Sequence, residues 1–318
     1  KKDIISHYQI DPTKITVVYP GFDSKLYEDP NQKDIFPNLP DSYILHVGTL
    51  HPRKGLAVLL KAIAQLRERN INLSLVCAGR DGWMVSSIRK QVVSLGLENM
   101  VHFVGFVPQE HLPTLYSRAK ITVLPSLYEG FGYTTLESMA AATPVVCTTA
   151  GSLPEVVGEA ALTVPANDSF SLAEAVNTVL ENQPLRKNLI TKGLKRCAMF
   201  SWTSTANQTL AIIEQVLSAN KAIEVKSINL KGKTSIADFM IIASGNSSRH
   251  IQALSGILLE KLKKKGIKNC RLEGHNSNDW KLIDAIDIII HIFHPEKRKF
   301  YDLESMWSEL IPKERLSL

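Results

Sequence analysis

Short apolar runs alternate with segments of helical periodicity between residues 43 and 148. The pattern predicts strands at 43–50, 73–78, 101–106, 121–124 and 145–148, separated by helices at 54–69, 83–95, 109–119 and 134–142. Strands joined by helices of this length run parallel, so the expected fold class is α/β with a doubly wound, Rossmann-like sheet. Ligands bind such sheets at the carboxyl ends of the strands, so the loops that follow the strands are the expected site.

One of these loops has the composition of an anion-binding site. Gly130 and Gly132 lie between a predicted strand and a predicted helix. Glycine lets the backbone approach a ligand, and the unpaired N–H groups of a first helical turn attract phosphate. Glu129 and Glu137 are eight residues apart, so both can face a ligand across the loop, one on a sugar and one on a ribose. The alternative is that both glutamates are merely solvated.

Two cations follow the first strand of the alternation. Arg53 and Lys54 close the segment Gly48-Thr-Leu-His-Pro-Arg-Lys. Cations at the mouth of a strand can lie beside a diphosphate and support the charge on a departing nucleotide. The alternative is an ordinary basic first turn of the next helix. Arg80 leaves a similar choice between diphosphate binding and a surface salt bridge.

The arrangement Glu-x7-Glu around Gly-Phe-Gly resembles the donor site of retaining nucleotide-sugar glycosyltransferases with the GT-B fold. The resemblance covers about residues 1–218. It implies that Glu129, Lys54 and Arg53 are catalytic. It also implies a UDP- or GDP-sugar donor bound by Glu137, Gly130, Phe131, Gly132, Gly48, Thr49, Phe106 and Val107. In the family the lysine at the position of Lys54 acts together with an arginine directly after the first glycine. Here Thr49 replaces that arginine, so Lys54 is the firmer assignment and Arg53 is the substitute for the arginine.

A GT-B enzyme also has a preceding domain that holds the acceptor, and the resemblance does not include it. Catalysis needs both substrates positioned together and water excluded. We therefore expect nucleotide-sugar binding from residues 1–218, and hexosyl transfer only if an N-terminal acceptor domain completes them. No metal and no further cofactor is expected.

A different pattern follows residue 218. Strands are predicted at 223–230, 240–244, 270–273, 280–283 and 288–293, and helices at 247–265 and 301–310. The short links indicate a small α/β domain at 219–318, beside a first domain at 1–218. The first domain is also predicted to contain a strand at 15–19 and helices at 172–180, 185–199 and 203–217. The last of these helices fits either domain.

Segments 235–242, 244–250, 272–274, 279–284 and 291–304 closely resemble, in order, the ribosomal silencing factor family (RsfS or Iojap). The resemblance implies a nucleotidyltransferase-like fold that binds the fourteenth protein of the large ribosomal subunit, blocks subunit joining and represses translation. The implied ribosome-binding residues are Arg249, His250, Lys297, Arg298, Tyr301 and Trp307. Nucleotidyl transfer is disfavoured because the paired metal-binding aspartates are missing.

The excess of basic residues in the second domain indicates an anionic binding partner. Residues 221–318 hold 17 Lys and Arg against 12 Asp and Glu, which is most of the net charge of +6. Such an excess is typical of RNA or ribosome binding, although lysines at one helix end would give the same balance. The cations and aromatics at 297–301 suit RNA or a protein interface, and the resemblance favours the protein interface. His291 and His294 point to opposite faces of a strand, so no metal site is expected there.

Composition places the chain in the cytoplasm. No run approaches the length of a membrane span, no signal pattern opens the sequence, and the four cysteines stand far apart. Two hypotheses therefore stand together, a donor-binding transferase half and a ribosome-binding module. The alternative is that only the ribosome-binding activity functions and the truncated transferase half is inactive. A natural fusion, two joined reading frames or a chimera would each explain the two halves, and the incomplete first domain favours the latter two.

Overall fold

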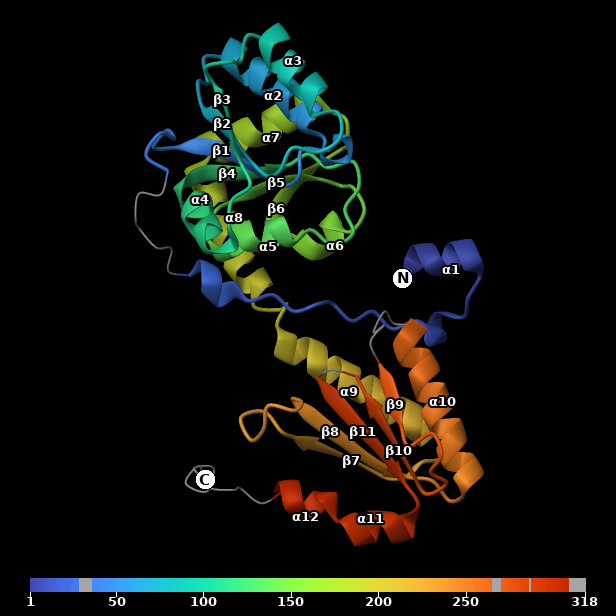
Figure 1. Ribbon diagram of the computed structural model, residues 1–318. Coiled ribbons are helices and arrows are strands. Elements are labelled where there is room, and N and C mark those ends of the chain that lie inside the picture. Colours follow the sequence, from blue (N-terminus) through green and yellow to red (C-terminus); the bar gives the residue numbers. More distant parts are fainter. Residues whose placement is uncertain (29–35, 265–269, 286, 309–318) are drawn as a thin grey trace. The chain divides into compact units, whose positions relative to one another are not determined.

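The computed structural model describes residues 1–28, 36–264, 270–285 and 287–308. These residues form two compact units, each built on its own sheet (Figure 1). The six-stranded unit comprises Pro20–Trp202. The five-stranded unit comprises Lys1–Tyr19 and the chain from Thr203 onward.

The six-stranded unit is a doubly wound parallel sheet, as the alternation predicts. Its strand order is β3-β2-β1-β4-β5-β6, and every neighbouring pair is parallel. The order reverses between β1 and β4, where such sheets bind ligands. The strands are β1 (Tyr43–Val47), β2 (Ser74–Ala78), β3 (Val101–Gly105), β4 (Ala119–Leu124), β5 (Val145–Thr148) and the unpredicted β6 (Ala161–Val164).

Helices cover both faces of this sheet (Figure 1). Helices α2 (Leu56–Glu68), α3 (Val85–Ser94) and α7 (Ser169–Glu181) lie on one side; the others are α4 (Leu112–Arg118), α5 (Tyr133–Ala140), α6 (Leu153–Val157) and α8 (Gln183–Cys197). In α2 the apolar spacing i, i+3, i+4 gives one face to the core, and Leu59, Leu60 and Ile63 are fully buried there.

Several predicted boundaries differ in the structure. Residues 15–19 form no strand. Helix α2 begins at Leu56 because residues 52–54 form a 3₁₀ turn, η3 (Pro52–Lys54), that ends at Gly55. Gly55 has a left-handed φ of 69°, and a Cβ there would collide with the carbonyl oxygen of Pro125. The helix predicted at 109–119 is a 3₁₀ turn, η4 (Gln109–His111), followed by α4.

The five-stranded unit is a mixed sheet of order β7-β8-β11-β10-β9. Neighbouring strands pair antiparallel except β8 and β11, which run parallel at the centre and are fully buried. The hairpin-like spacing of the sequence does not reveal this parallel pair. The strands are β7 (Ile223–Asn229), β8 (Phe239–Ser244), β9 (Arg271–Glu273), β10 (Trp280–Asp284) and β11 (Ile288–Phe293).

Helices α9 (Trp202–Ala219) and α10 (Ser248–Lys264) lie on one face of this sheet, and α11 (Pro295–Tyr301) and α12 (Leu303–Ser308) on the other (Figure 1). The prediction of one closing helix at 301–310 is therefore wrong. Two helices are present instead, and α11 ends at Asp302, whose φ of 41° is left-handed. Residues 309 and 310 lie outside the described part of the chain. The N-terminal stretch adds α1 (Lys2–Tyr8) and the 3₁₀ turn η1 (Pro12–Lys14).

Helix α9 belongs to the core of the five-stranded unit. It buries Leu210, Ile213, Val216 and Leu217 in the same cluster as the inner residues of β8, β11 and α10. The division between the units thus lies at residues 202 and 203, whereas the sequence placed it at 218 and 219. The apolar stripe of α9 indicates in the sequence that one face of the helix is buried. It does not indicate which of the two sheets that face packs against.

This packing predicts how fragments of the chain behave. A fragment of residues 203–318 should unfold cooperatively in urea, whereas one of residues 219–318 should be unfolded. The shorter fragment lacks four buried aliphatic side chains worth about 1.5–3 kcal/mol each, which together approach the stability of a whole domain. Circular dichroism during urea titration tests this, and a cooperative transition in the shorter fragment would contradict the role given to α9.

Candidate functional site

The loops at the carboxyl ends of β1, β2 and β3 are joined by backbone hydrogen bonds. The amide of Gly48 donates to Ala78 O (2.8 Å), that of Leu50 to Arg80 O (3.0 Å), and that of Gly79 to Gly105 O (2.7 Å). These bonds continue the parallel sheet beyond its regular strands and hold the three loops in register. The rim that the alternation predicts is therefore a fixed surface.

A nearly buried ion pair joins the loops after β1 and β4. Glu129, with a side chain 8% exposed, pairs through Oε1 with the ammonium of Lys54, whose side chain is 12% exposed. Ser126 Oγ donates to the same oxygen (2.9 Å), and Arg53 lies 3.7 Å from Oε2. Arg53 is half exposed and can turn toward a ligand. The three predicted catalytic residues therefore lie together.

The loop that carries Glu129 is held from both sides. The amide of Leu127 donates to Arg53 O (2.7 Å), and both the amide and the hydroxyl of Ser152 donate to Glu129 O (3.2 Å each). Gly151 has a left-handed φ of 59°, and a Cβ there would collide with the backbone of Glu129. The carboxylate position is thus fixed by the backbone and by its salt bridge together.

A buried histidine lies near this pair. His46, 1% exposed, hydrogen-bonds through Nδ1 to Val123 O at 3.1 Å. Because a carbonyl only accepts, Nδ1 carries the proton and Nε2 is a bare acceptor. Burial, together with the positive charge of Lys54, lowers the pKa of His46 to about 4 against the opposing effects of the hydrogen bond to Val123 and the charge of Glu129. The ring is therefore neutral at physiological pH and adds no charge beside Lys54 and Glu129.

Glu137 has different surroundings. Its Oε2 accepts a hydrogen bond from the hydroxyl of Tyr116 (2.7 Å), which is fully buried in α4. Tyr27, at the end of the 3₁₀ turn η2 (Ser24–Tyr27), packs against the Tyr116 ring at 6.0 Å between centroids. Burial raises the pKa of Glu137, while the hydroxyls of Tyr116 and Tyr27 act against that rise.

Glu137 lines a cavity of about 580 Å³ within the six-stranded unit. Phe106 and Val107, two further predicted donor residues, line it as well. The remaining walls are Gly21, Phe22, Asp23, Leu26, Tyr27, Gln109, Leu112, Tyr133 and Trp202. The cavity is therefore mostly apolar, with the partly buried carboxylate of Glu137 and the exposed carboxylate of Asp23 in its wall. A small number of polar groups in an apolar wall is the usual character of a small-molecule site.

Phe106 is 60% exposed and carries the Arg80 guanidinium 4.5 Å from its ring centroid. The Arg80 guanidinium thus forms a cation–π contact with a ring that lines the cavity, and it forms no ion pair with a described residue. An aromatic ring backed by a cation is a suitable platform for a planar base.

The predicted glycines differ in their placement. Gly132 precedes α5 with a φ of 99°, and no side chain caps this helix, so the amides at its start have no side-chain partner that would compete with an anion. Gly130 is exposed beside it, and Thr49 is exposed at the other side of the rim. Gly48 lies under the Lys54 side chain, because a Cβ there would be 3.4 Å from Cε. These residues surround the ion pair, and they are not part of the cavity wall.

Phe131 does not present its ring as a binding surface. The ring packs edge-on against Tyr133 (4.9 Å between centroids) and Phe200 (5.7 Å). Its contribution to the predicted donor site is therefore through its backbone, with the side chain anchoring the loop.

Sequence reasoning missed Tyr27, Tyr116, Ser126, His46 and Trp202. The nearest available signal was the Pro-Gly-Phe-Asp turn at 20–23, after which Tyr27 follows in η2. Gly21 is required there because a Cβ would collide with the Trp202 ring. That contact joins positions 181 residues apart in the chain, so no local pattern reveals it.

In the five-stranded unit, three of the six predicted contact residues are exposed: Arg249, Lys297 and Tyr301. Arg298 is instead 8% exposed and donates from Nε to Glu304 (2.8 Å) and from Nη1 to Ser244 Oγ (3.2 Å). This internal placement differs from the surface contact expected from the sequence, because the guanidinium is used to fasten α11 and α12 to β8.

Two further predicted contact residues are held internally. His250 accepts the amide of Asn246 on Nδ1 (3.2 Å), so its Nε2 is protonated and donates to Asn220 O (2.9 Å). The ring thereby ties the start of α10 to the end of α9. Trp307 is half-buried and packs on the outer sheet cluster with Phe293. The side chains of His250 and Trp307 therefore make contacts within the five-stranded unit.

A series of stacked rings crosses the α11 side of the sheet. Trp280 and Phe293 stack at 6.3 Å, and Phe293 continues to Tyr301 at 5.8 Å. His291 lies between them and accepts the Trp280 indole N–H on Nδ1 (3.1 Å). Burial lowers the pKa of His291 to about 4, so this ring is neutral as well. The series reaches the surface at Tyr301 and Phe300, which are 50% and 78% exposed.

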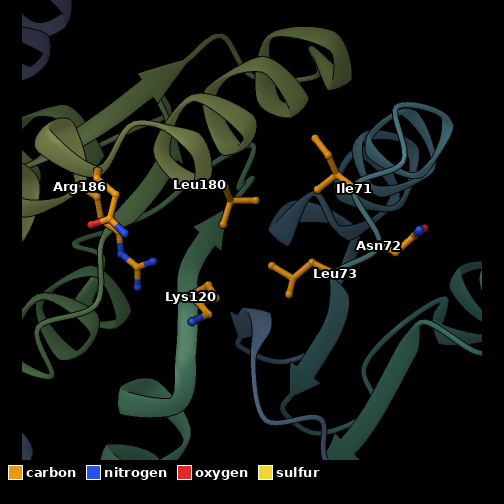
Figure 2. A pocket seen from close by; sticks show the side chains of 7 residues that line it. Ile71, Asn72, Leu73, Lys120, Leu180 and Arg186 are labelled. Carbon is orange, nitrogen blue, oxygen red and sulfur yellow. The ribbon is translucent and has the colours of Figure 1, made fainter.

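A second hollow, of about 410 Å³, lies at the opposite edge of the six-stranded sheet (Figure 2). Ile71, Leu73 and Leu180 form its apolar wall, while Lys120 and Arg186 bring two cations (Figure 2). Leu73 precedes β2 and Lys120 is the second residue of β4, so this hollow is at the amino ends of the strands. No Asp or Glu of the described chain lines this hollow, so it lacks the pairing of a carboxylate with cations that is found at the carboxyl ends of the strands.

Within the described residues, no group of three or more His, Cys, Asp and Glu side chains is placed to hold a metal ion. Over the same residues, no helix combines the length and the apolarity needed to cross a bilayer.

The ion pair between Lys54 and Glu129 leads to a prediction about the free energy of unfolding. Lys54→Met leaves the Glu129 carboxylate buried without its main partner, which we expect to cost about 3 kcal/mol of unfolding free energy. Adding Glu129→Gln to Lys54→Met should recover most of that loss, because the uncompensated charge is then gone. Urea unfolding of the two single variants and the double variant at neutral pH measures this coupling, and strictly additive losses would contradict it.

Comparison with known proteins agrees with this architecture. The profile of the family Glycosyl transferases group 1 matches residues 28–196, and that of Ribosomal silencing factor during starvation matches residues 203–317. O-antigen chain mannosyltransferase B of Escherichia coli is 38% identical over 170 residues, which are 53% of this chain and 44% of that protein. The chain spans about half the length of the curated relatives it matches.

Solved structures give the same result for the fold. Sucrose-phosphate synthase from Thermosynechococcus elongatus is 28% identical with a TM-score of 0.59, over 69% of this chain and 56% of that one. HepE of Anabaena in complex with UDP and glucose is 26% identical with a TM-score of 0.55, over 63% and 56%. The profile match over more than half of the chain, joined to a parallel sheet with its site at the carboxyl edge, shows that this protein belongs to the glycosyl transferases group 1 and carries a ribosomal silencing factor domain after it.

Proposed function

We propose that the six-stranded unit binds a nucleotide sugar as the donor half of a retaining hexosyltransferase. The observation that carries this proposal is the pairing of a cationic rim with a cavity lined by the partly buried carboxylate of Glu137. A nucleotide sugar has the matching parts, which are a diphosphate, a ribose with two hydroxyls and a planar base.

In this proposal the diphosphate lies beside Lys54 and Arg53, over the open amides at Gly132. Cations and helix amides oriented toward a phosphate before it binds stabilise charge that develops on it during bond cleavage. Glu129 then has two tasks, to hold Lys54 in place and to accept hydroxyls of the sugar. The half-exposed Arg53 is the cation that can move onto the leaving diphosphate.

The nucleoside occupies the cavity. Its ribose hydroxyls donate to Glu137, and its base rests near Phe106 and Val107, with the Arg80–Phe106 pair at the edge. HepE, whose solved complexes contain UDP, shares the fold at 26% identity and supports a nucleotide ligand for this chain. Transfer additionally requires an acceptor site, so binding is the activity to measure first.

The donor proposal predicts thermal stabilisation by a nucleotide sugar. UDP-glucose or GDP-mannose at about one hundred times its Kd should stabilise the six-stranded unit by about 2.7 kcal/mol, a shift of several degrees in Tm. Glu137→Ala should abolish the shift because it removes the ribose acceptor. Scanning fluorimetry of the whole chain measures both.

Glu68→Ala is the matched control, since Glu68 is an exposed glutamate on α2 and should leave the shift unchanged. A full shift in Glu137→Ala, or no shift of the unaltered chain with either nucleotide sugar, contradicts donor binding.

The five-stranded unit supports a second candidate function. We propose that it binds the large ribosomal subunit, at its fourteenth protein, and hinders subunit joining, thereby repressing translation. The family match at 203–317 and the exposed end of the aromatic series support this proposal. Lys297 lies 5.8 Å from the Phe300 centroid, so cation and ring form one exposed patch with Tyr301. Aromatic residues with a neighbouring cation are typical centres of protein interfaces.

Removing this patch should release the protein from ribosomes. The variant Lys297→Glu with Phe300→Ala should bind large subunits at least about tenfold more weakly than the unaltered chain, because an interface depends on a few central residues. Co-sedimentation at low salt measures binding, and sucrose gradients measure subunit joining.

Lys192→Glu makes the same charge change on the surface of the six-stranded unit and should leave pelleting intact. Failure of the unaltered chain to pellet contradicts ribosome binding. Pelleting without any nucleotide-sugar shift would instead favour the alternative that only the ribosome-binding activity functions.

A further inference from the structure

The two glutamates of the site are stabilised by opposite means. Glu129 is neutralised by Lys54 and approached by Arg53, so the pair carries no net negative charge. Glu137 has no ion pair among the described residues, and its Oε2 accepts a hydrogen bond from the neutral phenol of Tyr116. The cavity therefore contains a carboxylate whose charge is uncompensated by a cation.

Two phenols surround this carboxylate. Tyr116 is 0% exposed and donates to Oε2 at 2.7 Å. Tyr27 is 2% exposed and lines the cavity, and its hydroxyl makes no hydrogen bond of ordinary geometry to any described residue. The Glu137 charge nevertheless reaches that hydroxyl, because after burial it is the next cause that raises the pKa of Tyr27. Because Tyr27 packs against the Tyr116 ring and lines the same cavity as Glu137, its hydroxyl is available as a second donor to the carboxylate.

The neutral state of the phenols is secure. Burial, followed by the Glu137 charge, raises the pKa of Tyr116 well above that of an ordinary tyrosine. Both hydroxyls therefore keep their protons at physiological pH. A phenol O–H that donates to a carboxylate favours the ionised form of that carboxylate, whereas burial favours the protonated form.

The other described titratable groups near Glu137 neither donate a hydrogen bond to its carboxylate nor neutralise its charge. Helix α8 brings Cys197, whose thiol donates to Leu136 O, and burial raises the pKa of Cys197 to about 12. Asp23 and Tyr133 line the same cavity, and the Tyr133 hydroxyl lies 3.5 Å from Gly21 O. Among the described residues, no lysine or arginine forms an ion pair with Glu137.

We propose that Tyr27 and Tyr116 are positioning residues that keep Glu137 ionised and turned toward the cavity, and that they thereby set the lower pH limit of donor binding. The inference rests on the proposed nucleotide-sugar site. Ribose hydroxyls donate to a carboxylate, so binding needs the ionised Glu137 and weakens as pH falls through its pKa. Loss of either phenol raises that pKa and moves the weakening to higher pH.

Titration calorimetry of the whole chain with UDP-glucose and GDP-mannose between about pH 5 and pH 8 tests this, since the diphosphate of a nucleotide sugar does not titrate there. Tyr27→Phe and Tyr116→Phe should each weaken binding at least about threefold near pH 6 and less than about twofold near pH 8. Glu137→Gln should bind weakly with no dependence on pH, because it cannot ionise.

Tyr43→Phe is the matched control. It removes an equally buried hydroxyl, which donates to Leu115 O at 2.7 Å, and should lower stability without moving the pH profile. A Tyr27→Phe profile that superposes on that of the unaltered chain overturns the role of Tyr27, and a pH-dependent Glu137→Gln overturns the role of Glu137. Absence of binding by the unaltered chain at every pH overturns the proposed function itself together with this inference.

Discussion

The buried ion pair between Lys54 and Glu129 is the contact on which the arrangement of the rim depends. It joins the loop after β1 to the loop after β4, the two strands between which the strand order reverses. Placing two charges in a nearly dry position is costly unless their geometry is fixed. The backbone bonds from Leu127 and Ser152 provide that fixing, so the same contacts that stabilise the fold also position Arg53 and the open amides of α5.

The site divides its electrostatics between two regions. Around Glu129 the cations of Lys54 and Arg53 balance the carboxylate, and the Arg53 side chain is half exposed. Around Glu137 the neutral phenol of Tyr116 provides the hydrogen bond, and no cation among the described residues pairs with the carboxylate. An anionic diphosphate and a polyhydroxyl ribose call for these opposite environments. The structure places them within one unit, the first at the rim and the second in the cavity.

The two units have separate cores, and helix α9 decides where one ends. Its buried residues Leu210, Ile213 and Leu217 belong to the cluster of the five-stranded sheet, which agrees with the family match beginning at residue 203. Each unit therefore carries its own complete core and its own candidate surface. The rim and the cavity proposed as the donor site consist of residues from 20–202, and the aromatic patch at 297–301 belongs to the five-stranded unit.

The sequence by itself determined the parallel sheet, the glycine loop at 130–132 and the grouping of Glu129 with Lys54, because strand and helix periods are local and parallel topology brings strand ends together. Only the tertiary structure decided that Tyr27 and Tyr116 surround Glu137, that Arg298 is internal, and that α9 packs on the second sheet. An apolar stripe or a tyrosine records that a side chain is buried. The residue that a buried side chain contacts depends on which surfaces come together when segments far apart in the sequence pack in the folded protein. No local sequence pattern contains that information.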